Sequence, residues 1–508
     1  MTSEHPAREL LLDGDPHDAA LEGHVHPPGW KNPTPSGRYN LVVVGAGTAG
    51  LVAAGGGALL GGKVALVERR LMGGDCLNFG CVPSKALLRS AAVAATVREA
   101  AAFGVETGPA RVDFTKVMER VRALRAEIAP HDSAERFKRF GADVYLGEGR
   151  FVAPDALEVA GQRLTFARAV IATGGRPWVP DVPGLADVDF LTSESVFSLT
   201  ALPPRMVLLG GGPIGCELAQ AFQRLGAEVT VVAKDARLLP RDDAEAAALL
   251  ARRLESEGVR LCLGAALTRV EARGGVKRVH FEQGGVAGVV EGEALLVATG
   301  RAPELGGLGL EAAGVRHGPQ GVEVDDHLRT SNPRIYAAGD VASRFQFTHA
   351  AEALARVALQ NALFLGRKRA SALTIPWCTY TEPEVAHVGL TAPEAAARGT
   401  RVVTLTLPME EADRAIVDGR KEGFARLHVD SRSGKVLGAT LVGARAGELI
   451  GTVALMMARG VSAMALSELV VPYPTYTEVL HKLGGEWFFH RLGARAKGAL
   501  RRLLSWRR

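Results

Sequence analysis

The stretch Leu41-Val-Val-Val-Gly45-Ala-Gly47-Thr-Ala-Gly50 joins a short β-branched run to three spaced glycines. An Ala- and Gly-rich segment and the apolar run Val64-Ala-Leu-Val-Glu68 follow, which predicts a strand, a helix and a second strand. In such a βαβ unit the first glycine permits a tight turn, the second lets a pyrophosphate approach the backbone, and an acid after the second strand binds a ribose. The sequence therefore predicts a dinucleotide site formed by Gly45, Gly47, Gly50 and Glu68.

A second copy of this pattern begins at Met206-Val-Leu-Leu209 and continues as Gly210-Gly-Gly212-Pro-Ile-Gly215. A helix and the apolar run Glu228-Val-Thr-Val-Val232 are expected after it, so the chain is predicted to bind two dinucleotides. An acid at the end of that last strand would bind the ribose of NAD, but Ala233 and Lys234 stand there. A cation favours a 2′-phosphate, and the second dinucleotide is therefore predicted to be NADPH rather than NADH.

Each copy is followed by a similar closing element. Ile171-Ala-Thr173-Gly174 and Val297-Ala-Thr-Gly300 are both apolar runs that stop at a glycine, and each predicts a strand ending in a turn. The repetition indicates that one architecture is duplicated within the chain.

Two cysteines lie in the run Gly73-Gly-Asp-Cys76-Leu-Asn-Phe-Gly-Cys81-Val-Pro-Ser-Lys85, between the two copies. Four residues between the thiols let a small loop close with the sulfurs in bonding range, and the N-terminal dipole of a helix entered at Pro83 favours a thiolate. A zinc site needs about four ligands at paired spacings, which the other three cysteines do not offer. No metal site is predicted, and Cys76 and Cys81 are interpreted as a redox-active pair, with a structural disulfide as the alternative.

Composition limits the class of protein. A chain of 508 residues suggests three or four domains. The net charge of +5 comes from residues 491–508, which hold seven Lys and Arg and no acid. No nucleic-acid partner is therefore expected; the tail is interpreted as a solvated or frayed terminus, with membrane-surface contact as the alternative. Residues 1–37 lack the basic start and apolar stretch of a signal peptide, so a cytoplasmic location is expected.

The cysteine run resembles the signature of the class I pyridine nucleotide disulfide oxidoreductases, and the resemblance extends from about Tyr39 to about His490. It implies FAD at the first fingerprint and a homodimer with a shared active site. It also implies a pair between Lys85 and Glu217 beside the flavin and an FAD contact from Asp340. The other positions that it assigns to the cofactors are Gly149, Thr173, Gly174, Ala350 and Gly300.

The most discriminating departure from that family is at Tyr473. Where the disulfide-reducing branches show His-Pro-Thr-x-x-Glu, this chain reads Tyr473-Pro-Thr-Tyr-Thr-Glu478, and a phenol with a pKa of about 10 cannot cycle protons near neutrality as imidazole does. Mercuric reductases resemble the chain here, although their C-terminal cysteine pair is missing. The sequence predicts a mercuric-reductase-like enzyme that reduces a thiophilic metal ion or small electrophile. Dihydrolipoyl dehydrogenase and a non-catalytic flavoprotein component are the alternatives.

The expected fold class is α/β, with two Rossmann-like dinucleotide-binding domains and a C-terminal α+β dimerisation domain. Amphipathic helices are expected at 114–129 and 132–140. The predicted map is a polar extension at 1–37, an FAD domain at 38–177 and 303–368, an NADP domain at 178–302, an interface domain at 369–490 and a basic tail at 491–508.

Overall fold

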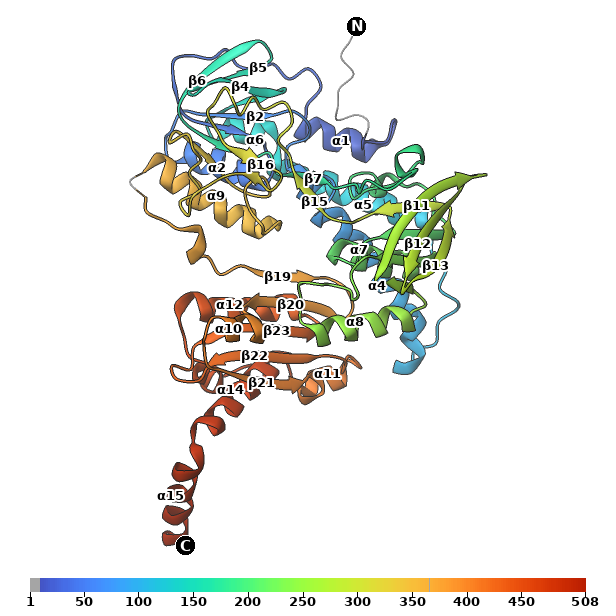
Figure 1. The fold of residues 1–508 in the computed structure, drawn as a ribbon, viewed down its shortest axis with the longest axis vertical. Helices are drawn as coiled ribbons and strands as arrows, with labels where there is room; N and C mark the ends of the chain where they lie inside the picture. The colour runs from blue at the N-terminus through green and yellow to red at the C-terminus, as the bar shows by residue number, and fades with distance from the viewer. Residues whose placement is uncertain (1–9, 365) are drawn as a thin grey trace. The chain divides into compact units, whose positions relative to one another are not determined.

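The computed structural model describes residues 10–364 and 366–508, which form two compact units (Figure 1). The first unit runs up to Ala236 and resumes over Glu257–Leu373. The second comprises Arg237–Ser256 and Thr374–Arg508. The boundaries predicted between the two nucleotide-binding domains stay a prediction.

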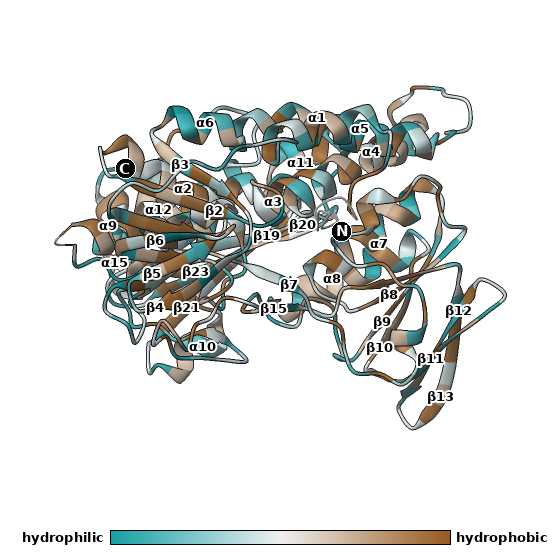
Figure 2. Cartoon of the chain, turned by 90° about the horizontal axis from the view of Figure 1, so that it is seen from above, coloured by the Kyte–Doolittle hydropathy of each residue, from teal (hydrophilic) through white to brown (hydrophobic). Residues whose placement is uncertain are grey.

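The first unit is built on a seven-stranded sheet in the order β3-β2-β1-β6-β5-β4, with β18 beside β6. The pairings of β1 with β2 and β6, of β2 with β3 and of β18 with β6 are parallel, and Val44 lies in register with both Val67 and Ile171. The strands are β1 Tyr39–Val44, β2 Val64–Glu68, β3 Ala142–Leu146, β4 Gly149–Ala153, β5 Ala156–Val159, β6 Gln162–Ile171 and β18 Ile335–Ala337. Because β1 is buried on both faces from Leu41 onward and β2 up to Val67, residues 41–44 and 64–67 are continuous apolar runs. In Figure 2 the labelled strand β6 of the same sheet also shows brown, apolar stretches.

Helices α2 Thr48–Leu59 and α9 Thr348–Leu363 pack against each other in this unit. A Cβ at Gly56 would lie 2.6 Å from Leu359 Cδ2, so the glycines of α2 allow the close approach. The expected amphipathic helices are present as α5 Phe114–Ile128 and α6 Ala134–Arg139. Each is capped by the side chain of the residue before it, Asp113 or Ser133.

The second fingerprint lies on a four-stranded parallel sheet in the order β10-β9-β8-β14. Its strands are β8 Arg205–Leu209, β9 Glu228–Ala233, β10 Arg260–Leu263 and β14 Ala294–Val297, and helix α7 Pro213–Leu225 follows β8. An antiparallel sheet of β11 Ala265–Arg273, β12 Val276–Gln283 and β13 Val286–Gly292 was not anticipated from the sequence. Two short ladders, β7 Gly175–Pro177 with β15 Arg301–Pro303 and β16 His317–Gly318 with β17 Gly321–Val322, complete the strands of the unit.

The N-terminal extension contributes helix α1, Pro16–Val25, to the first unit. Leu21 and Val25 lie one turn apart and are fully buried in the core around β1 and β2. Asp15 and Asp18 pair with Arg122 and Arg125 of α5 at 2.8 and 3.3 Å. Residues 16–25, expected only to be polar, are therefore an integral part of the core.

The second unit is centred on an antiparallel sheet in the order β19-β20-β23-β22-β21. The strands are β19 Pro376–Thr379, β20 Glu384–Gly389, β21 Val402–Pro408, β22 Phe424–Asp430 and β23 Val436–Gly443. The helices are α8 Ala244–Ser256, α10 Ala392–Ala397, α11 Asp413–Val417, α12 Ala446–Arg459, α13 Met464–Glu468, α14 Glu478–Arg491 and α15 Gly493–Trp506. The α/β sheets of the first unit and the α+β second unit confirm the expected fold class.

Within residues 10–364 and 366–508, no helix is both long enough and apolar enough to cross a membrane.

Candidate active site

Both fingerprints use the same contact between their first and third glycines. A Cβ at Gly50 would lie 1.7 Å from the carbonyl oxygen of Gly45, and one at Gly215 would lie 2.1 Å from that of Gly210. Gly45 and Gly210 themselves have φ values of 99° and 113°, which an L side chain rarely adopts. Steric need at two matched turns therefore explains why both glycine patterns occur, and the predicted duplication is present in the structure.

Glu68 closes the first fingerprint at the end of β2. Its two carboxylate oxygens accept hydrogen bonds from the backbone N–H groups of Ala46 (2.6 Å) and Arg70 (2.7 Å). Burial raises the pKa of Glu68, although these two hydrogen bonds oppose the shift. Each oxygen keeps a second lone pair for a ligand hydroxyl.

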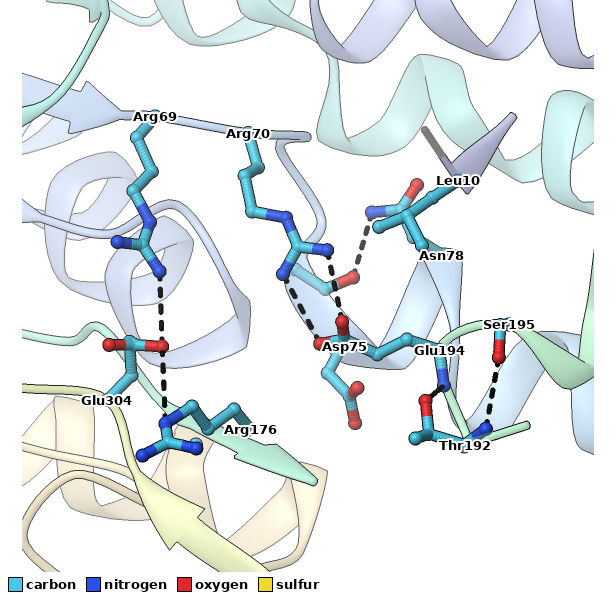
Figure 3. A network of polar contacts seen from close by, with 12 residues as sticks. Leu10, Arg69, Arg70, Asp75, Asn78, Arg176, Thr192, Glu194, Ser195 and Glu304 are labelled. Carbon is cyan, nitrogen blue, oxygen red and sulfur yellow. Dashed lines mark hydrogen bonds and ion pairs between the residues drawn. The ribbon is translucent and has the colours of Figure 1, made fainter. Parts of the chain in front are cut away.

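A pocket at the carboxyl ends of β1 and β2 gathers four of the predicted cofactor residues. Gly45, Glu68, Gly149 and Thr173 all line it, together with Glu304, which was not predicted. Glu304 pairs with Arg69 at 3.1 Å, as Figure 3 shows, and its backbone carbonyl accepts a hydrogen bond from Thr173 Oγ1 at 2.7 Å. Residues scattered over more than 250 positions of sequence thus form one concave site, the location where open α/β sheets bind ligands.

The cysteine loop packs directly on the first fingerprint. A Cβ at Gly74 would lie 2.5 Å from the Cα of Gly47, and Gly74 has a φ of 57°. Helix α3, Gly74–Asn78, begins at this contact and carries Cys76, while Cys81 is the first residue of α4, Cys81–Glu99. Asn78, labelled in Figure 3, donates to the carbonyls of Met72 (3.1 Å) and Gly74 (2.8 Å) and holds the loop closed.

Cys76 and Cys81 are both present as thiols, and their acidities differ. The hydrogen bond with Cys76, together with the Thr348 hydroxyl and the Lys85 ammonium, lowers the pKa of Cys81 to about 6. The same hydrogen bond and burial raise the pKa of Cys76. Cys81 Sγ lies 3.2 Å from the hydroxyl oxygen of Thr348, and Thr348 is the first residue of α9. The arrangement stabilises one thiolate, on Cys81, at neutral pH.

We expect Cys81 in the reduced protein to be half thiolate near pH 6, whereas a free thiol has a pKa of about 8.5. Its rate of alkylation by iodoacetamide, followed on the Cys81 peptide by mass spectrometry, should therefore reach a plateau by pH 7. Thr348→Val removes one hydrogen bond to the thiolate and should move the midpoint upward, while Thr348→Ser should not. A Cys81 midpoint near 8.5 in the unaltered protein would contradict the assigned thiolate.

Lys85 and Glu217 form the ion pair that the resemblance implies. Lys85 Nζ lies 2.7 Å from Glu217 Oε2, and the Glu217 side chain is only 7% exposed. Lys85 stands one helical turn after Cys81 on α4, and Glu217 is on α7, which packs against α4. The pairing is as predicted; the role of both residues beside a flavin stays a prediction.

A buried arginine links the cysteine loop to Asp340. Arg301 Nη1 lies 3.3 Å from Asp75 Oδ2, and its Nε lies 3.3 Å from Asp340 Oδ2. Arg301 also donates to the Gly175 carbonyl at 2.8 Å. This hydrogen bond connects the turn at Gly300 with the turn at Gly174. Neither Asp75 nor Arg301 was predicted, although Asp75 adjoins Cys76 and Arg301 directly follows the Gly300 turn.

The glycine positions of both sites fit dinucleotides. A Cβ at Gly212, Gly174 or Gly300 would meet no atom within 4 Å, so the backbone there is open to a ligand. Lys234 is exposed immediately after β9, and Ala350 is buried in the first turn of α9. Arg237, a second cation that follows β9 in the sequence, donates to the carbonyls of Pro240 and Asp242 in its own loop. The preference for NADPH over NADH stays a prediction.

Tyr473 and Glu478 belong to the second unit, where both contact Asp413. The Tyr473 hydroxyl donates to Asp413 Oδ2 at 2.7 Å, and this hydrogen bond raises the pKa of Tyr473. Glu478 accepts from the Asp413 N–H at 3.4 Å and pairs with Lys482 at 3.1 Å. The Tyr473 side chain is 72% exposed, and sequence analysis did not identify Asp413 as its partner.

The chain belongs to the pyridine nucleotide-disulphide oxidoreductases. The model of that family matches residues 39–355, and the model of the family's dimerisation domain matches residues 375–483. The family binds FAD and a pyridine nucleotide, and the dimerisation domain implies a homodimer. The suspected family and the expected flavoprotein class are confirmed.

Two kinds of relatives are similar to this chain. It is 37% identical to a mercuric reductase from Bacillus cereus over 87% of this chain and 70% of the relative. It is 33% identical to a dihydrolipoyl dehydrogenase from Mycoplasma pneumoniae over 87% of this chain and 97% of the relative. Among solved structures, it resembles the Cu(II) complex of the HOCl-induced flavoprotein disulfide reductase RclA from Escherichia coli. The TM-score is 0.76 at 28% identity, over 87% of this chain and 98% of that chain.

Proposed function

We propose that this protein is an FAD-dependent, NADPH-using reductase of the mercuric-reductase-like branch that reduces a thiophilic metal ion or another small electrophile. The observation that carries the proposal is Tyr473, an exposed phenol hydrogen-bonded to Asp413 where disulfide reductases have a histidine. The cysteine pair on the first unit is otherwise equipped for redox chemistry. A cytoplasmic location remains part of the proposal.

The bound FAD supplies a two-electron relay between the reduced nicotinamide and the cysteine pair. Two electrons and two protons open the Cys76 to Cys81 disulfide into two thiols. Cys81 then loses its proton near neutrality, since its pKa is about 6, and Lys85 and Thr348 stabilise the resulting charge. Cys76 is left to bond the acceptor through its sulfur. When the acceptor takes two electrons, the disulfide forms again and the remaining thiol proton is released.

The comparisons support this branch without settling the acceptor. Relatives named mercuric reductase have 37% and 35% identity, and the RclA structure is described as a Cu(II) complex. Thiolate sulfur is a ligand that soft metal ions prefer.

Stopped-flow reduction with NADPH, followed by mercuric ion, cupric ion, lipoamide or a quinone, tests the proposal. We expect a metal ion to be reduced at least about a hundredfold faster than lipoamide, because a phenol cannot supply the acid-base help worth about 10²- to 10⁴-fold. Faster lipoamide turnover would make the protein a dihydrolipoyl dehydrogenase. A flavin that is reduced but passes electrons to none of these acceptors would favour a non-catalytic component.

The preference for NADPH is tested by Lys234→Ala. Removing one charge-assisted hydrogen bond to the 2′-phosphate should weaken NADPH binding by about 1–3 kcal/mol and leave NADH unchanged. Lys234→Arg is the conservative variant and should retain the preference, and dissociation constants from flavin-reduction kinetics give the comparison. Equal or better turnover with NADH in the unaltered enzyme would refute the assignment of NADPH.

The proposed active site is shared between two subunits, with the Tyr473 segment of one completing the cysteine site of the other. The support is the dimerisation-domain match at residues 375–483, which contains Tyr473, and the exposure of its phenol.

A further inference from the structure

The basic tail, residues 491–508, forms a helix with two chemically distinct faces. Helix α15 runs from Gly493 to Trp506. At 3.6 residues per turn, Leu500, Leu503, Leu504 and Trp506 fall on one half of its circumference. Lys497, Arg501 and Arg502 fall on the other half. The tail is therefore an ordered amphipathic helix, which its composition alone did not indicate.

The apolar face of α15 is open to solvent. Leu500 and Leu503 are each 44% exposed, Leu504 is 60% exposed and Trp506 is 82% exposed. In Figure 1, α15 is the red helix that continues from α14 to the C-terminus. Four large apolar side chains in adjacent turns lack the burial that apolar residues at helical spacing normally have.

We propose that α15 lies in the surface of an anionic lipid bilayer, with its leucines and Trp506 among the acyl chains and its cations at the headgroups. The charge of this segment favours an anionic surface as the partner of the apolar face, because residues 491–508 hold seven Lys and Arg and no acid. A basic face opposite Leu and Trp on a helix too polar to span is the pattern of interfacial helices. This inference is independent of the electron acceptor.

Two other partners, a second copy of α15 and a nucleic acid, match the two faces of α15 less well than a bilayer does. A second copy of α15 would bring four more cations, and a helix about 21 Å long offers less apolar surface than the roughly 800 Å² per partner of a stable interface. A nucleic acid would engage the cations through phosphates but leave the leucine and tryptophan stripe in water. A bilayer satisfies both faces at once.

Co-sedimentation of the full holoenzyme with vesicles tests the proposal. We expect binding to vesicles of phosphatidylcholine with phosphatidylglycerol, little binding to phosphatidylcholine alone, and loss of binding in high salt. Arg501→Gln with Arg502→Gln should weaken the partition coefficient by roughly fivefold per charge. Leu500→Ala with Leu504→Ala keeps helix propensity and should also release the protein. The matched control, Arg163→Gln with Arg273→Gln, removes two exposed cations elsewhere and should bind normally.

Several results would overturn the proposal. These are no binding to anionic vesicles, equal binding to both kinds of vesicle, or equal weakening by the control pair. The Trp506→Phe variant gives a second readout. Adding vesicles should shift the tryptophan emission of the unaltered protein to shorter wavelength, and the variant should not show this shift. A change in oligomeric state on altering the leucines, without vesicle binding, would assign the face to a second copy. Binding to duplex DNA that needs the arginines but not the leucines would assign it to nucleic acid.

Discussion

Replacing Cys76 with serine is expected to abolish turnover with every acceptor, by at least about 10³-fold, while NADPH still reduces the flavin. The physical reason is that Cys76 is assigned the bond to the acceptor, and a serine hydroxyl can neither form a disulfide nor hold a soft metal. The unaltered protein should take up about four electrons in a dithionite titration, two for FAD and two for the disulfide, and Cys76→Ser should take up about two.

The two cysteines are separable in the same experiment. Cys76 is assigned to the acceptor, and we propose that Cys81, whose pKa is lowered, faces the flavin. Cys76→Ser should therefore keep a long-wavelength absorption band from a thiolate beside FAD, and Cys81→Ser should lose it. Cys378→Ser, a half-buried cysteine on β19, is the matched control and should behave as the unaltered protein. Full turnover in Cys76→Ser, or a two-electron titration of the unaltered protein, would contradict the redox pair.

Changing Tyr473 to histidine is the second change with a large expected effect. An imidazole accepts protons near neutrality, so Tyr473→His should raise lipoamide reduction by as much as about 10²- to 10⁴-fold. Tyr473→Phe removes the hydroxyl that contacts Asp413 and should depress metal-ion reduction, with flavin reduction by NADPH unaltered. The rates of the two half-reactions, measured separately by stopped flow, distinguish these effects.

A conservative variant and a mixed dimer sharpen this test. Asp413→Asn keeps the size of the group that orients Tyr473 but removes its charge, so it should lower the pKa of the phenol toward its ordinary value. If the site is shared, a dimer of one Cys76→Ser subunit and one Tyr473→Phe subunit contains one intact site and regains metal reduction lost in either parent. Robust lipoamide turnover by the unaltered protein near neutral pH would defeat the assigned role of Tyr473.

Much of the nucleotide-binding framework could be predicted because its signals are local. The strand, turn and helix around Gly45 and Gly50 depend on residues within one βαβ unit, where apolar runs, helix starts and tight turns each leave a pattern. The predicted β9 and α7 were found for the same reason. Cys76 and Cys81 needed only a spacing of five positions.

The contact between Lys85 and Glu217 came from resemblance and not from pattern. These residues are 132 positions apart, and no periodicity records that α4 packs on α7. Helix α1 at residues 16–25 was not predicted, because the N-terminal extension is polar and rich in His and Pro. Its two apolar side chains, Leu21 and Val25, lie one turn apart on the same face of α1 and are buried.

The amino-acid sequence by itself determined the family, the two fingerprints, the cysteine pair and the tyrosine that stands in place of histidine. Only the tertiary structure decided that Arg301 joins Asp75 to Asp340, that Asp413 holds Tyr473, and that α15 presents an open apolar face. The reason is physical: turns and helical periods are encoded by neighbours along the chain. Ion pairs and burial depend instead on which distant segments the packed sheets bring together. No local pattern in a single sequence indicates such contacts.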